Sequence, residues 1–353
     1  MSESTMPAVV HYELARGACE LRERPVPEIG PDDVLLRVGA VGVCGSDVHQ
    51  YHNSHSWGVN VPVVLGHEFS GVVERVGERV TGFAEGDRVV SETAAVVDPS
   101  SPFTRSGRYN LDPARKGFGY GVDGAMARYV RVPARCLHRV PRGLSLLTAA
   151  LSEPCCVAYN AVVESTKISP GDVVVVVGPG PIGLLCAHMA KLRGAEVVVV
   201  GVGRDRARLD LAASRWATVA FDVQQEDVAN ALRGMGDGYG ADAVIDASGA
   251  SAALKAALQW VRPEGQITKV GWGPQPLDFS LDPLVQKAVT LRGSFSHTYP
   301  IWERVIHLLA SGALDPTPLV SRTEALDGWQ PCFDGMGEGS LIKAVLLPNG
   351  PVE

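Results

Sequence analysis

The sequence has few of the features that would attach a protein to a membrane or to nucleic acid. No apolar run among its 353 residues approaches the roughly 18–20 residues of a membrane-spanning helix. The opening MSESTMPAVV lacks the basic start and apolar core of a secretory signal. Acidic side chains outnumber basic ones, and the net charge of −7 disfavours binding to polyanions. We therefore expect a cytoplasmic protein with neither a membrane nor a nucleic acid as partner.

Cysteine is also scarce. The seven cysteines are scattered from Cys19 to Cys332, and an odd number spread over a long chain does not form a disulfide framework. We expect most of the thiols to be reduced and buried, including the adjacent pair Cys155 and Cys156. A cysteine that departs from this expectation needs a chemical reason.

The pattern of apolar residues changes along the chain. From residue 7 to about 155, short β-rich runs such as DVLLRVGAVGV and GVVERVG are bounded by glycine and proline, which is typical of a β-rich unit. From about 158 to 297, apolar runs such as DVVVVVG alternate with amphipathic helices such as PIGLLCAHMAKLRG. This alternation predicts an α/β fold with a parallel sheet covered on both faces. The tail from about 298 predicts one helix and short strands.

The segment VVVVVGPGPIG places three glycines in the spacing G-x-G-x-x-G, directly after a strand and at the start of a helix. The first glycine permits a tight turn, the second lets the backbone approach a pyrophosphate, and the third lets the helix pack on the strand. In this context the motif indicates a dinucleotide-binding turn rather than a structural turn. The predicted coenzyme-binding residues here are Gly178, Gly180, Pro181, Ile182 and Gly183.

The second strand, in AEVVVVGVGRDRARL, bears on which coenzyme binds. Counting back from a helix that begins near Arg208, the tip of the strand falls at Gly203 and is followed by Arg204. A carboxylate at this tip binds the ribose 2′-hydroxyl of NAD, whereas an arginine accommodates the 2′-phosphate of NADP. Gly203, Arg204 and Arg208 therefore favour NADP. NAD is the alternative, because Asp205 could bind the ribose and Arg204 could be an ordinary surface residue.

Two segments of the β-rich part, GVCGSDVHQY and VLGHEFSGVVERVGERV, carry potential metal ligands. Cys44, His67 and Glu68 offer a soft thiolate, an imidazole and a carboxylate, which suits a catalytic zinc with one position left open. A single cysteine or histidine is more often core filling. Three such residues flanked by glycine turns indicate a metal site.

These segments, together with GDRV, SEPCCVAYNAV, RKGFGYGVDGAMARYV, ADAVIDASG and GSFSHTY in the same order, resemble the zinc-containing medium-chain dehydrogenase family and its branch of sorbitol and threonine dehydrogenases. The resemblance runs nearly end to end. It implies a GroES-like catalytic domain formed by residues 1–157 and 298–353, with a Rossmann domain at residues 158–297. It also implies a homodimer or homotetramer with a small-molecule alcohol or ketone as substrate.

The resemblance assigns roles to individual residues. Cys44, His67 and Glu68 match zinc ligands, and Glu153 matches a second acidic residue that can coordinate the zinc or replace its water. The zinc would polarise the substrate oxygen while Ser46 and His49 relay a proton to solvent. The residues implied at the coenzyme are Val270, Ser294 and Phe295 beside the carboxamide and Lys343 near the pyrophosphate.

The substrate is less narrowly defined by the sequence. Four aromatic residues are equally compatible with a substrate pocket and with ordinary core: Tyr51, Trp57, Phe118 and Phe295. Relatives that oxidise polyols tend to have an arginine soon after GSF, where this chain reads SHTY, which weakens the case for a sugar alcohol. The expected substrate is a secondary alcohol, polyol or ketone. Two alternatives stay open, a zinc-free quinone or enoyl reductase on the same fold and a non-catalytic NADP-binding protein.

A long polar loop, VVDPSSPFTRSGRYNLDPARKGFGYG, covers residues 96–121. In many members of the resembled family this lobe holds a structural zinc through cysteines spaced C-x₂-C-x₂-C-x₇-C. The positions at that spacing here are Asp98, Ser101, Thr104 and Asp112, none of them a thiol. We therefore expect one zinc per chain, at the catalytic site, and a lobe that is held by its own packing, held by a neighbouring subunit, or mobile.

Overall fold

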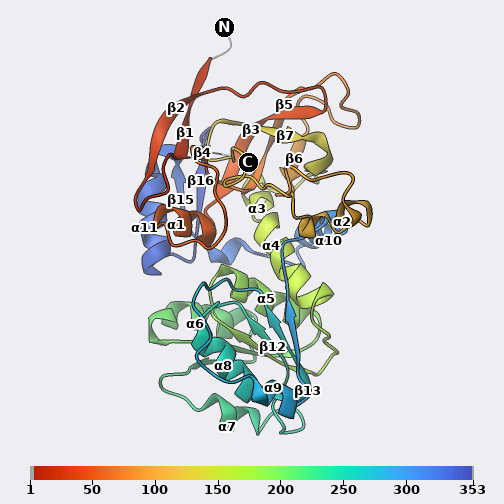
Figure 1. Cartoon of the computed structure of the whole chain (residues 1–353), viewed down its shortest axis with the longest axis vertical. Helices are drawn as coiled ribbons and strands as arrows, with labels where there is room; N and C mark the ends of the chain where they lie inside the picture. The colour runs from red at the N-terminus through yellow and green to blue at the C-terminus, as the bar shows by residue number, and fades with distance from the viewer. Residues whose placement is uncertain (1–3, 352–353) are drawn as a thin grey trace. The chain divides into compact units, whose positions relative to one another are not determined.

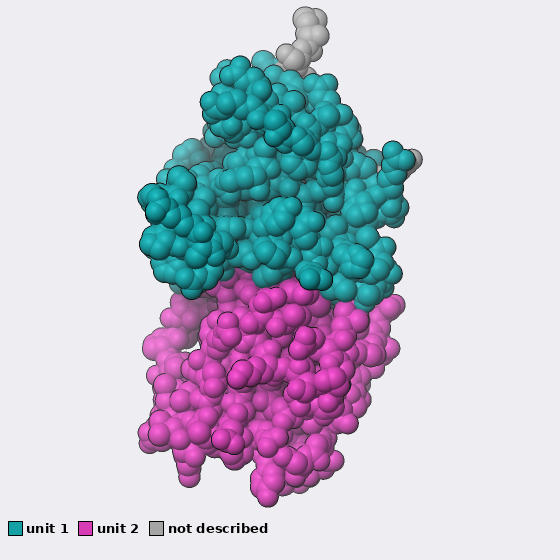
Figure 2. All heavy atoms as spheres, turned by 90° about the vertical axis from the view of Figure 1, so that its right-hand side faces the viewer, with its two compact units in different colours: residues 1–153, 297–353 teal, residues 154–296 magenta. Residues whose placement is uncertain are grey.

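The computed structural model describes residues 4–351, and the chain divides into two compact units. Unit 1 contains the described residues up to Glu153 and those from His297 onward, and unit 2 contains Pro154–Ser296 (Figure 2). Both terminal segments of the chain therefore belong to the same unit. Within the described range, no helix is long and apolar enough to cross a membrane.

Unit 1 is built mainly from strands (Figure 1). Its strands are β1 (Thr5–His11), β2 (Cys19–Pro25), β3 (Asp33–Gly42), β4 (Val63–Val64), β5 (Glu68–Val76), β6 (Arg88–Ser91), β7 (Tyr129–Pro133), β8 (Leu137–Arg139), β15 (Val320–Ala325) and β16 (Lys343–Leu347). Its helical segments are α1 (Gly45–Tyr51), α2 (Pro102–Arg105), η1 (Tyr109–Leu111), η2 (Ala134–Cys136), α3 (Leu146–Ala150), α10 (Tyr299–Ala310), η5 (Thr317–Leu319), η6 (Leu326–Gly328) and α11 (Trp329–Glu338). Helix α4 (Ser152–Tyr159) begins in unit 1 and continues into unit 2.

The strands of unit 1 form two sheets. The larger has the order β15-β16-β3-β5-β6-β8, with β7 also paired to β3, and the smaller has the order β2-β1-β4. Strand β3 is almost entirely buried, because apolar side chains on both of its faces pack into the core. Strand β16, from the far end of the chain, pairs with β3 next to the point where β5 begins. This pairing brings residues from three distant segments to one edge of the core.

Unit 2 alternates strands and helices. Its strands are β9 (Val173–Val177), β10 (Glu196–Gly201), β11 (Val219–Asp222), β12 (Ala241–Asp246), β13 (Val261–Lys269) and β14 (Thr290–Gly293). Its helical segments are η3 (Asn160–Glu164), α5 (Pro181–Leu192), η4 (Gly203–Asp205), α6 (Arg206–Arg215), α7 (Val228–Leu232), α8 (Ser251–Trp260) and α9 (Asp282–Gln286).

The six strands of unit 2 form one parallel sheet with the order β11-β10-β9-β12-β13-β14. The central strand β9 consists of five valines, all buried, as expected of a parallel strand covered on both faces. Numbered within the unit, the order is 3-2-1-4-5-6, which is the order of the Rossmann fold. The predicted α/β class, with a β-rich unit beside a doubly wound parallel sheet, is confirmed.

The second strand of this sheet ends earlier than the sequence predicted. Strand β10 ends at Gly201 rather than at Gly203, and helix α6 begins at Arg206 rather than near Arg208. The physical reason is local, because the Asp205 carboxylate accepts a hydrogen bond of 3.2 Å from the Val202 backbone N–H. That bond closes a short 3₁₀ turn from Gly203 to Asp205 directly after the strand.

The long loop of unit 1 is organised around the carboxylate of Asp112. One oxygen of Asp112 accepts from the backbone N–H of Asp98 at 2.6 Å and from the Thr104 hydroxyl at 3.0 Å. The other oxygen accepts from the Ala114 N–H at 3.0 Å. The bond from Ala114 is the largest of the influences that together hold the pKa of Asp112 below its usual value. Residues at the cysteine spacing are thus joined by hydrogen bonds.

A second set of contacts ties this loop to the rest of unit 1. The Tyr109 hydroxyl donates to Glu92 at 2.6 Å and accepts from the backbone N–H of Tyr299, at the start of α10, at 2.5 Å. The ring nitrogens of His138, on β8, lie 3.2 Å from Glu92 and 2.5 Å from Glu303. Contacts within one unit therefore hold the loop in place.

Candidate active site

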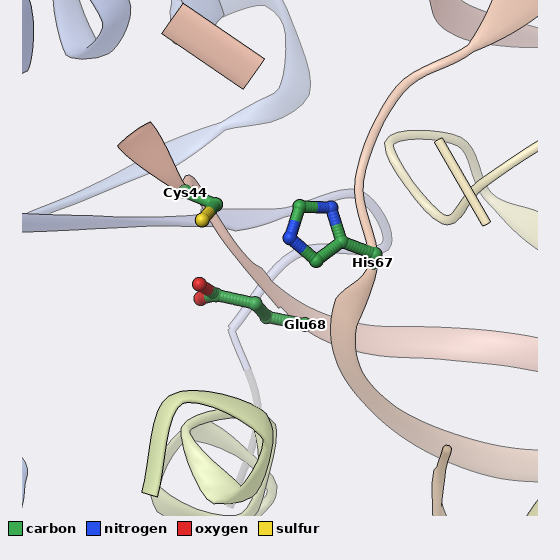
Figure 3. A group of neighbouring side chains, drawn as sticks. All are labelled: Cys44, His67 and Glu68. Carbon is green, nitrogen blue, oxygen red and sulfur yellow. The ribbon is translucent and has the colours of Figure 1, made fainter. Parts of the chain in front are cut away.

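Three potential metal ligands meet at the edge of the larger sheet of unit 1. One ligand atom from each of Cys44, His67 and Glu68 can be chosen such that all three lie within 4.8 Å of one another. Cys44 is the N-cap residue of α1, just after β3, and the other two stand at the start of β5. Figure 3 shows the thiol, the carboxylate and one imidazole nitrogen directed toward a common point. Among residues 4–351 this is the one group of three or more such side chains.

Two glycines make this arrangement possible. Gly42 pairs with Glu68 across β3 and β5, and a side chain at Gly42 would collide with the Glu68 carboxylate. Gly66 has a φ of +94°, and a Cβ there would lie 2.8 Å from Met126. Since only glycine adopts that backbone conformation without strain, Gly66 allows the chain to turn and to direct His67 toward Cys44.

Asp47 supports the histidine from behind. Its carboxylate accepts from the Cys44 backbone N–H at 2.9 Å, and its other oxygen lies 3.7 Å from His67 Nδ1. Burial acts to lower the pKa of His67, but the Asp47 carboxylate and the Cys44 thiol outweigh it and raise that pKa well above its usual value. A carboxylate behind a histidine ligand fixes the ring and makes it a better donor to a metal. The sequence-based prediction missed Asp47, although its place three residues after Cys44 in a helix was a usable signal.

Lys343 lies at this cluster, and its contact with the pyrophosphate stays a prediction. Its side chain is almost completely buried, and its ammonium donates to the Val43 carbonyl at 2.8 Å and forms an ion pair with Glu68. The reason is the pairing of β16 with β3, which places the first residue of β16 beside the cluster. Both described partners of the ammonium belong to unit 1.

Glu153, the second acidic candidate, is buried close to the cluster without being one of its three members. His297 Nε2 lies 3.1 Å from Glu153 Oε1. Burial acts to raise the pKa of Glu153, but the hydrogen bond from His297, together with the charges of His67 and Lys343, outweighs it and lowers that pKa. Sequence reasoning missed His297, whose segment SHTY was considered only for its lack of an arginine.

The two relay candidates lie on α1. Ser46 Oγ is 3.4 Å from His67 Nε2, so its hydroxyl is adjacent to the cluster. His49 reaches solvent, and its Nδ1 is 3.0 Å from Ser54 Oγ. Partial burial of the ring, followed by the nearby His52 and His55, lowers the pKa of His49. Within the described part of the chain there is no direct hydrogen bond between Ser46 and His49, so the relay stays a prediction.

The ligand set fits zinc by its chemistry. A thiolate, an imidazole and a carboxylate are the donors that zinc takes in proteins, and three protein ligands are typical of a catalytic rather than a structural site. The other described thiols are different, since burial raises the pKa of Cys19, Cys136 and Cys186 to about 12. Cys44 is only partly buried and stands among charged partners.

In unit 2, the glycine-rich turn has the geometry that its spacing predicted. Gly178, directly after β9, has a φ of +92°, and a side chain there would press against Ser248. A Cβ on Gly183 would overlap the carbonyl oxygen of Gly178, so the third glycine lets the helix start close to the strand. Nothing lies within 4 Å of the Cβ position of Gly180, the N-cap residue of α5. That space is open for a phosphate at the helix N-terminus.

The turn after β10 contains the carboxylate of Asp205, and both of its oxygens already have partners within the protein. One oxygen of Asp205 accepts from Val202, and the other lies 3.5 Å from Arg208 Nη1. The Gly203 N–H donates to Gln224 Oε1 at 3.1 Å, and Arg204 is exposed. The end of β10 therefore carries two arginines, Arg204 and Arg208. The carboxylate of this turn, Asp205, already has partners for both of its oxygens.

The remaining coenzyme candidates also lie at carboxyl ends of strands. Val270 follows β13 and Ser294 follows β14, directly after the paired residues Lys269 and Gly293. Phe295 comes next, with its carbonyl 3.3 Å from Asn160 Nδ2. The carboxyl edge of a parallel sheet is where Rossmann folds bind dinucleotides. Their contact with a coenzyme stays a prediction.

The aromatic pocket candidates divide into two kinds. Phe118 is fully buried and packs edge-on against Phe69, so it is a core residue. The Tyr51 ring packs edge-on against Trp329 and Phe333 and borders the same core. The other two are less buried: Trp57 is half-buried beside His49 and His55, and Phe295 is exposed beside Trp272.

Comparison with known proteins agrees with this geometry. Residues 30–142 match the alcohol dehydrogenase GroES-like domain, and residues 181–311 match the zinc-binding dehydrogenase domain. A sorbitol dehydrogenase of Halalkalibacterium halodurans is 38% identical to this chain, over 97% of this chain and 99% of that protein. The chain belongs to the zinc-containing medium-chain alcohol dehydrogenase family. Like its family, it is an oxidoreductase that acts on CH–OH groups with zinc and a nicotinamide coenzyme.

Two further comparisons describe this family member more closely. A D-arabitol-phosphate dehydrogenase of Enterococcus avium is 38% identical over 93% of each chain. The crystal structure of a zinc-binding dehydrogenase from Sinorhizobium meliloti, bound to NADP, superposes with a TM-score of 0.90 at 29% identity, covering 98% of this chain and 100% of the other. The family resemblance recognised from the sequence motifs is confirmed.

Proposed function

We propose that this protein transfers a hydride between NADP and the hydroxyl-bearing carbon of a polyol or another secondary alcohol, with the corresponding ketone as the product or the reverse substrate. The observation that carries the proposal is the convergence of Cys44, His67 and Glu68 within 4.8 Å. A zinc-free quinone or enoyl reductase would have no use for such a cluster. Similarity to a sorbitol dehydrogenase and a D-arabitol-phosphate dehydrogenase supports a polyol, although the segment SHTY lacks the arginine expected of polyol-oxidising relatives.

The cluster would hold the zinc through Cys44, His67 and Glu68, with Glu153 as a further acidic ligand or as the partner of a water. Bound there, zinc supplies a Lewis acid for the substrate oxygen. The chain's own residues hold and move the proton. Ser46 stands beside the cluster, and His49, with a lowered pKa and access to solvent, is neutral near pH 7 and can accept a proton.

The coenzyme preference is proposed from the end of β10. Because Asp205 is bonded to Val202 and Arg208, it is not available to bind a ribose 2′-hydroxyl in the manner of NAD-specific folds. Arg204 is exposed at the same turn and can pair with a 2′-phosphate. The structural relative with bound NADP supports this choice. Val270, Ser294 and Phe295 are proposed to bind the nicotinamide end.

The decisive experiment combines metal analysis with a substrate panel. Purified protein should contain zinc at the Cys44 cluster, and removal of that zinc by a chelator should abolish NADP-linked oxidation of polyols and secondary alcohols. Addition of zinc should restore it. An activity that survives complete removal of the metal would refute a zinc-dependent reaction. A panel in which only enones or quinones react would instead support the reductase alternative.

The coenzyme proposal is tested by substitution of Arg204. The change Arg204→Ala should lower kcat/KM for NADP about 10- to 100-fold, since a charge-assisted hydrogen bond contributes about 1.5–3 kcal/mol, and should leave NAD nearly unaffected. Arg206→Ala is the matched control, because Arg206 is exposed and forms an ordinary i,i+4 pair with Asp210. A wild-type preference for NAD of tenfold or more would contradict the proposal.

Three broader features remain proposals. The catalytic domain is proposed to comprise residues 1–157 and 298–353 and the Rossmann domain residues 158–297, supported by two compact units whose limits lie a few residues earlier. A homodimer or homotetramer is supported by β14, an edge strand whose residues, Leu291 among them, are all exposed, with the exposed Val285 nearby in the chain. A cytoplasmic location is supported by buried, free thiols at Cys19, Cys136, Cys186 and Cys332.

A further inference from the structure

A chain of hydrogen bonds, formed by Glu153, His297 and Trp302, lies beside the metal cluster and is so far unused in the reaction. His297 Nε2 is 3.1 Å from Glu153 Oε1, and the Trp302 indole Nε1–H donates to His297 Nδ1 at 2.7 Å. The three residues are 7%, 2% and 0% exposed. Since His297 and Trp302 are almost completely buried, the hydrogen bond between them is determined by the protein alone.

The indole decides where the proton of His297 lies. A tryptophan N–H can only donate, so the nitrogen that it faces must be an acceptor. His297 Nδ1 therefore carries no proton, and the single ring proton sits on Nε2, facing Glu153. A cationic ring would place an N–H of its own against the indole N–H. The pair of His297 and Glu153 is thus a hydrogen bond from a neutral imidazole to a carboxylate.

Trp302 is itself held on two sides. Its ring stacks on His138 with centroids 5.5 Å apart and an angle of 9° between the planes, and it meets His297 edge-on at 5.1 Å and 86°. Thr298 is the N-cap residue of α10. His297 therefore directly precedes the N-cap, and Trp302 is the fourth residue of the helix. Side chains at these two positions regularly pack on each other and fix how the chain enters a helix.

The backbone before His297 is also fixed. Ser296 has a φ of +55°, a left-handed conformation that is unfavourable for a residue other than glycine. Asn160 Nδ2 donates to the Ser296 carbonyl at 2.7 Å and to the Phe295 carbonyl at 3.3 Å, which stabilises that turn. His297 directly follows this turn and directly precedes helix α10. The direction of its imidazole is therefore fixed by the turn on one side and by the start of the helix on the other.

The consequence concerns the Glu153 carboxylate. The charge of Glu153 acts on His67, Glu68 and Lys343, which places it next to the cluster. Among residues 4–351, His297 is the one residue that donates a hydrogen bond to the Glu153 side chain, and the acceptor is Oε1. The second oxygen, Oε2, has no hydrogen bond from those residues and is left as an acceptor.

We propose that His297, locked by Trp302 as a neutral ring protonated on Nε2, is a positioning residue that holds one oxygen of Glu153 and presents the other to the metal site and the substrate hydroxyl. Trp302 is the residue that enforces the tautomer. The proposal deepens the function proposed above and rests on it for the role of Glu153. The tautomer itself can be measured without any turnover.

The first test uses the wild-type enzyme loaded with zinc and NADP. With ¹⁵N-labelled histidine, the nitrogen signals of His297 should be those of a neutral ring protonated on Nε2, with Nδ1 accepting the Trp302 N–H. The variant His297→Gln identifies the signals by their loss among the nine histidines. A cationic ring, or a ring protonated on Nδ1, would overturn the proposal whatever the enzyme's activity.

The second test compares variants for zinc affinity, measured by competition with a chelator, and for kcat. Trp302→Phe keeps an aromatic ring and removes the N–H, and His297→Leu removes the donor to Glu153. Each should lose about 10- to 100-fold in zinc affinity or kcat, as is usual when a residue supporting a metal site is lost. His297→Gln retains an N–H donor and should recover most of the loss. KM for NADP should not change.

The matched control is Trp216→Phe, because Trp216 is a buried tryptophan stacked on a histidine, His188, in unit 2. It should leave zinc affinity unchanged. If Trp302→Phe does not fold, the two His297 variants and the wild-type tautomer still decide. Equal behaviour of His297→Leu and His297→Gln would refute a positioning role. If no alcohol or ketone reacts with the wild type, the proposed function fails, while tautomer and zinc affinity still test His297.

Discussion

Two regions of unit 1, the cluster at Cys44 and the loop around Asp112, correspond to the two metal sites of the resembled family. They differ in whether their buried polar atoms have hydrogen-bond partners. At the cluster, the three ligand side chains face one another, and His67 Nδ1 and Asp47 Oδ1 are buried with no hydrogen-bond partner. In the loop, both oxygens of Asp112 accept hydrogen bonds from neighbouring groups. The cluster leaves buried polar atoms without a hydrogen-bond partner, and the Asp112 carboxylate of the loop does not.

The difference lies in the chemistry of the donors. A closed structural zinc site takes four sulfur or nitrogen ligands, and the loop offers hydroxyls and carboxylates at the corresponding positions. Carboxylates and hydroxyls can bond to each other and to backbone N–H groups, so Asp112 can take over the connecting role of a metal. A thiol, an imidazole and a carboxylate buried together gain little from each other without a shared cation.

The largest effect is expected where the cluster is broken. The change Cys44→Ala removes the one sulfur ligand, and we expect loss of bound zinc and a fall in kcat/KM of about a thousandfold or more, since a Lewis acid stabilises the transition state by several kcal/mol. Metal analysis and polyol oxidation measure the two losses. Cys136→Ala, a buried thiol outside the cluster, is the control. Unchanged zinc content in Cys44→Ala would show that the cluster is not the metal site.

The next effect concerns the Lys343 ammonium, a cation that already lies at the cluster. The change Lys343→Met leaves the buried Glu68 carboxylate without its partner and should destabilise the zinc-free protein by about 3–5 kcal/mol. Zinc would supply the missing positive charge, so the loaded protein should lose much less. Unfolding with and without zinc measures the difference. Lys287→Met, which removes an ammonium bonded to three carbonyls in unit 2, should destabilise both forms equally. An equal loss in Lys343→Met would contradict the idea.

What the sequence could and could not predict follows from the distance between partners. The glycine turn at Gly178 and the cluster motifs were predictable, because local backbone geometry and ligand chemistry belong to short segments. The place of Lys343 beside the cluster was not predictable, since its partner Val43 is 300 residues away and only the pairing of β16 with β3 brings them together. His297 was missed for the same reason, being 144 residues from Glu153.

The two regions should also respond to pH in opposite directions. The pKa of His67 is raised, so a proton occupies its ring up to a higher pH and must be displaced by zinc. Zinc affinity should therefore rise with pH, by about tenfold per unit for each proton displaced. The same shift stabilises the zinc-free fold at low pH, and that contribution is lost as pH rises through the folded-state pKa. Chelator competition at a series of pH values measures the first effect. A zinc affinity that does not vary with pH would show that no proton is displaced from His67.

The smallest effect is expected in the loop. The change Asp112→Asn replaces an oxygen acceptor by an N–H₂ group, so bonds from Asp98, Thr104 or Ala114 are lost. Amide hydrogen exchange over residues 98–114 should speed up about tenfold, since local opening reflects local bonding, while zinc content and kcat stay within about twofold because no ligand is touched. Asp98→Asn is the control, as its side chain accepts only from Ser100 among the described contacts.

The loop should also depend on pH. The pKa of Asp112 is lowered, so the contribution of its carboxylate to the stability of the loop is present above the unfolded-state pKa and is lost as pH falls through the folded-state pKa. The protection of the wild-type loop amides, relative to their intrinsic exchange rate at each pH, should therefore fall in acid, and the variant should show no such fall. A loop that exchanges equally fast in both proteins would mean that Asp112 does not hold it, and that the contacts of Tyr109 with Glu92 and α10 are sufficient.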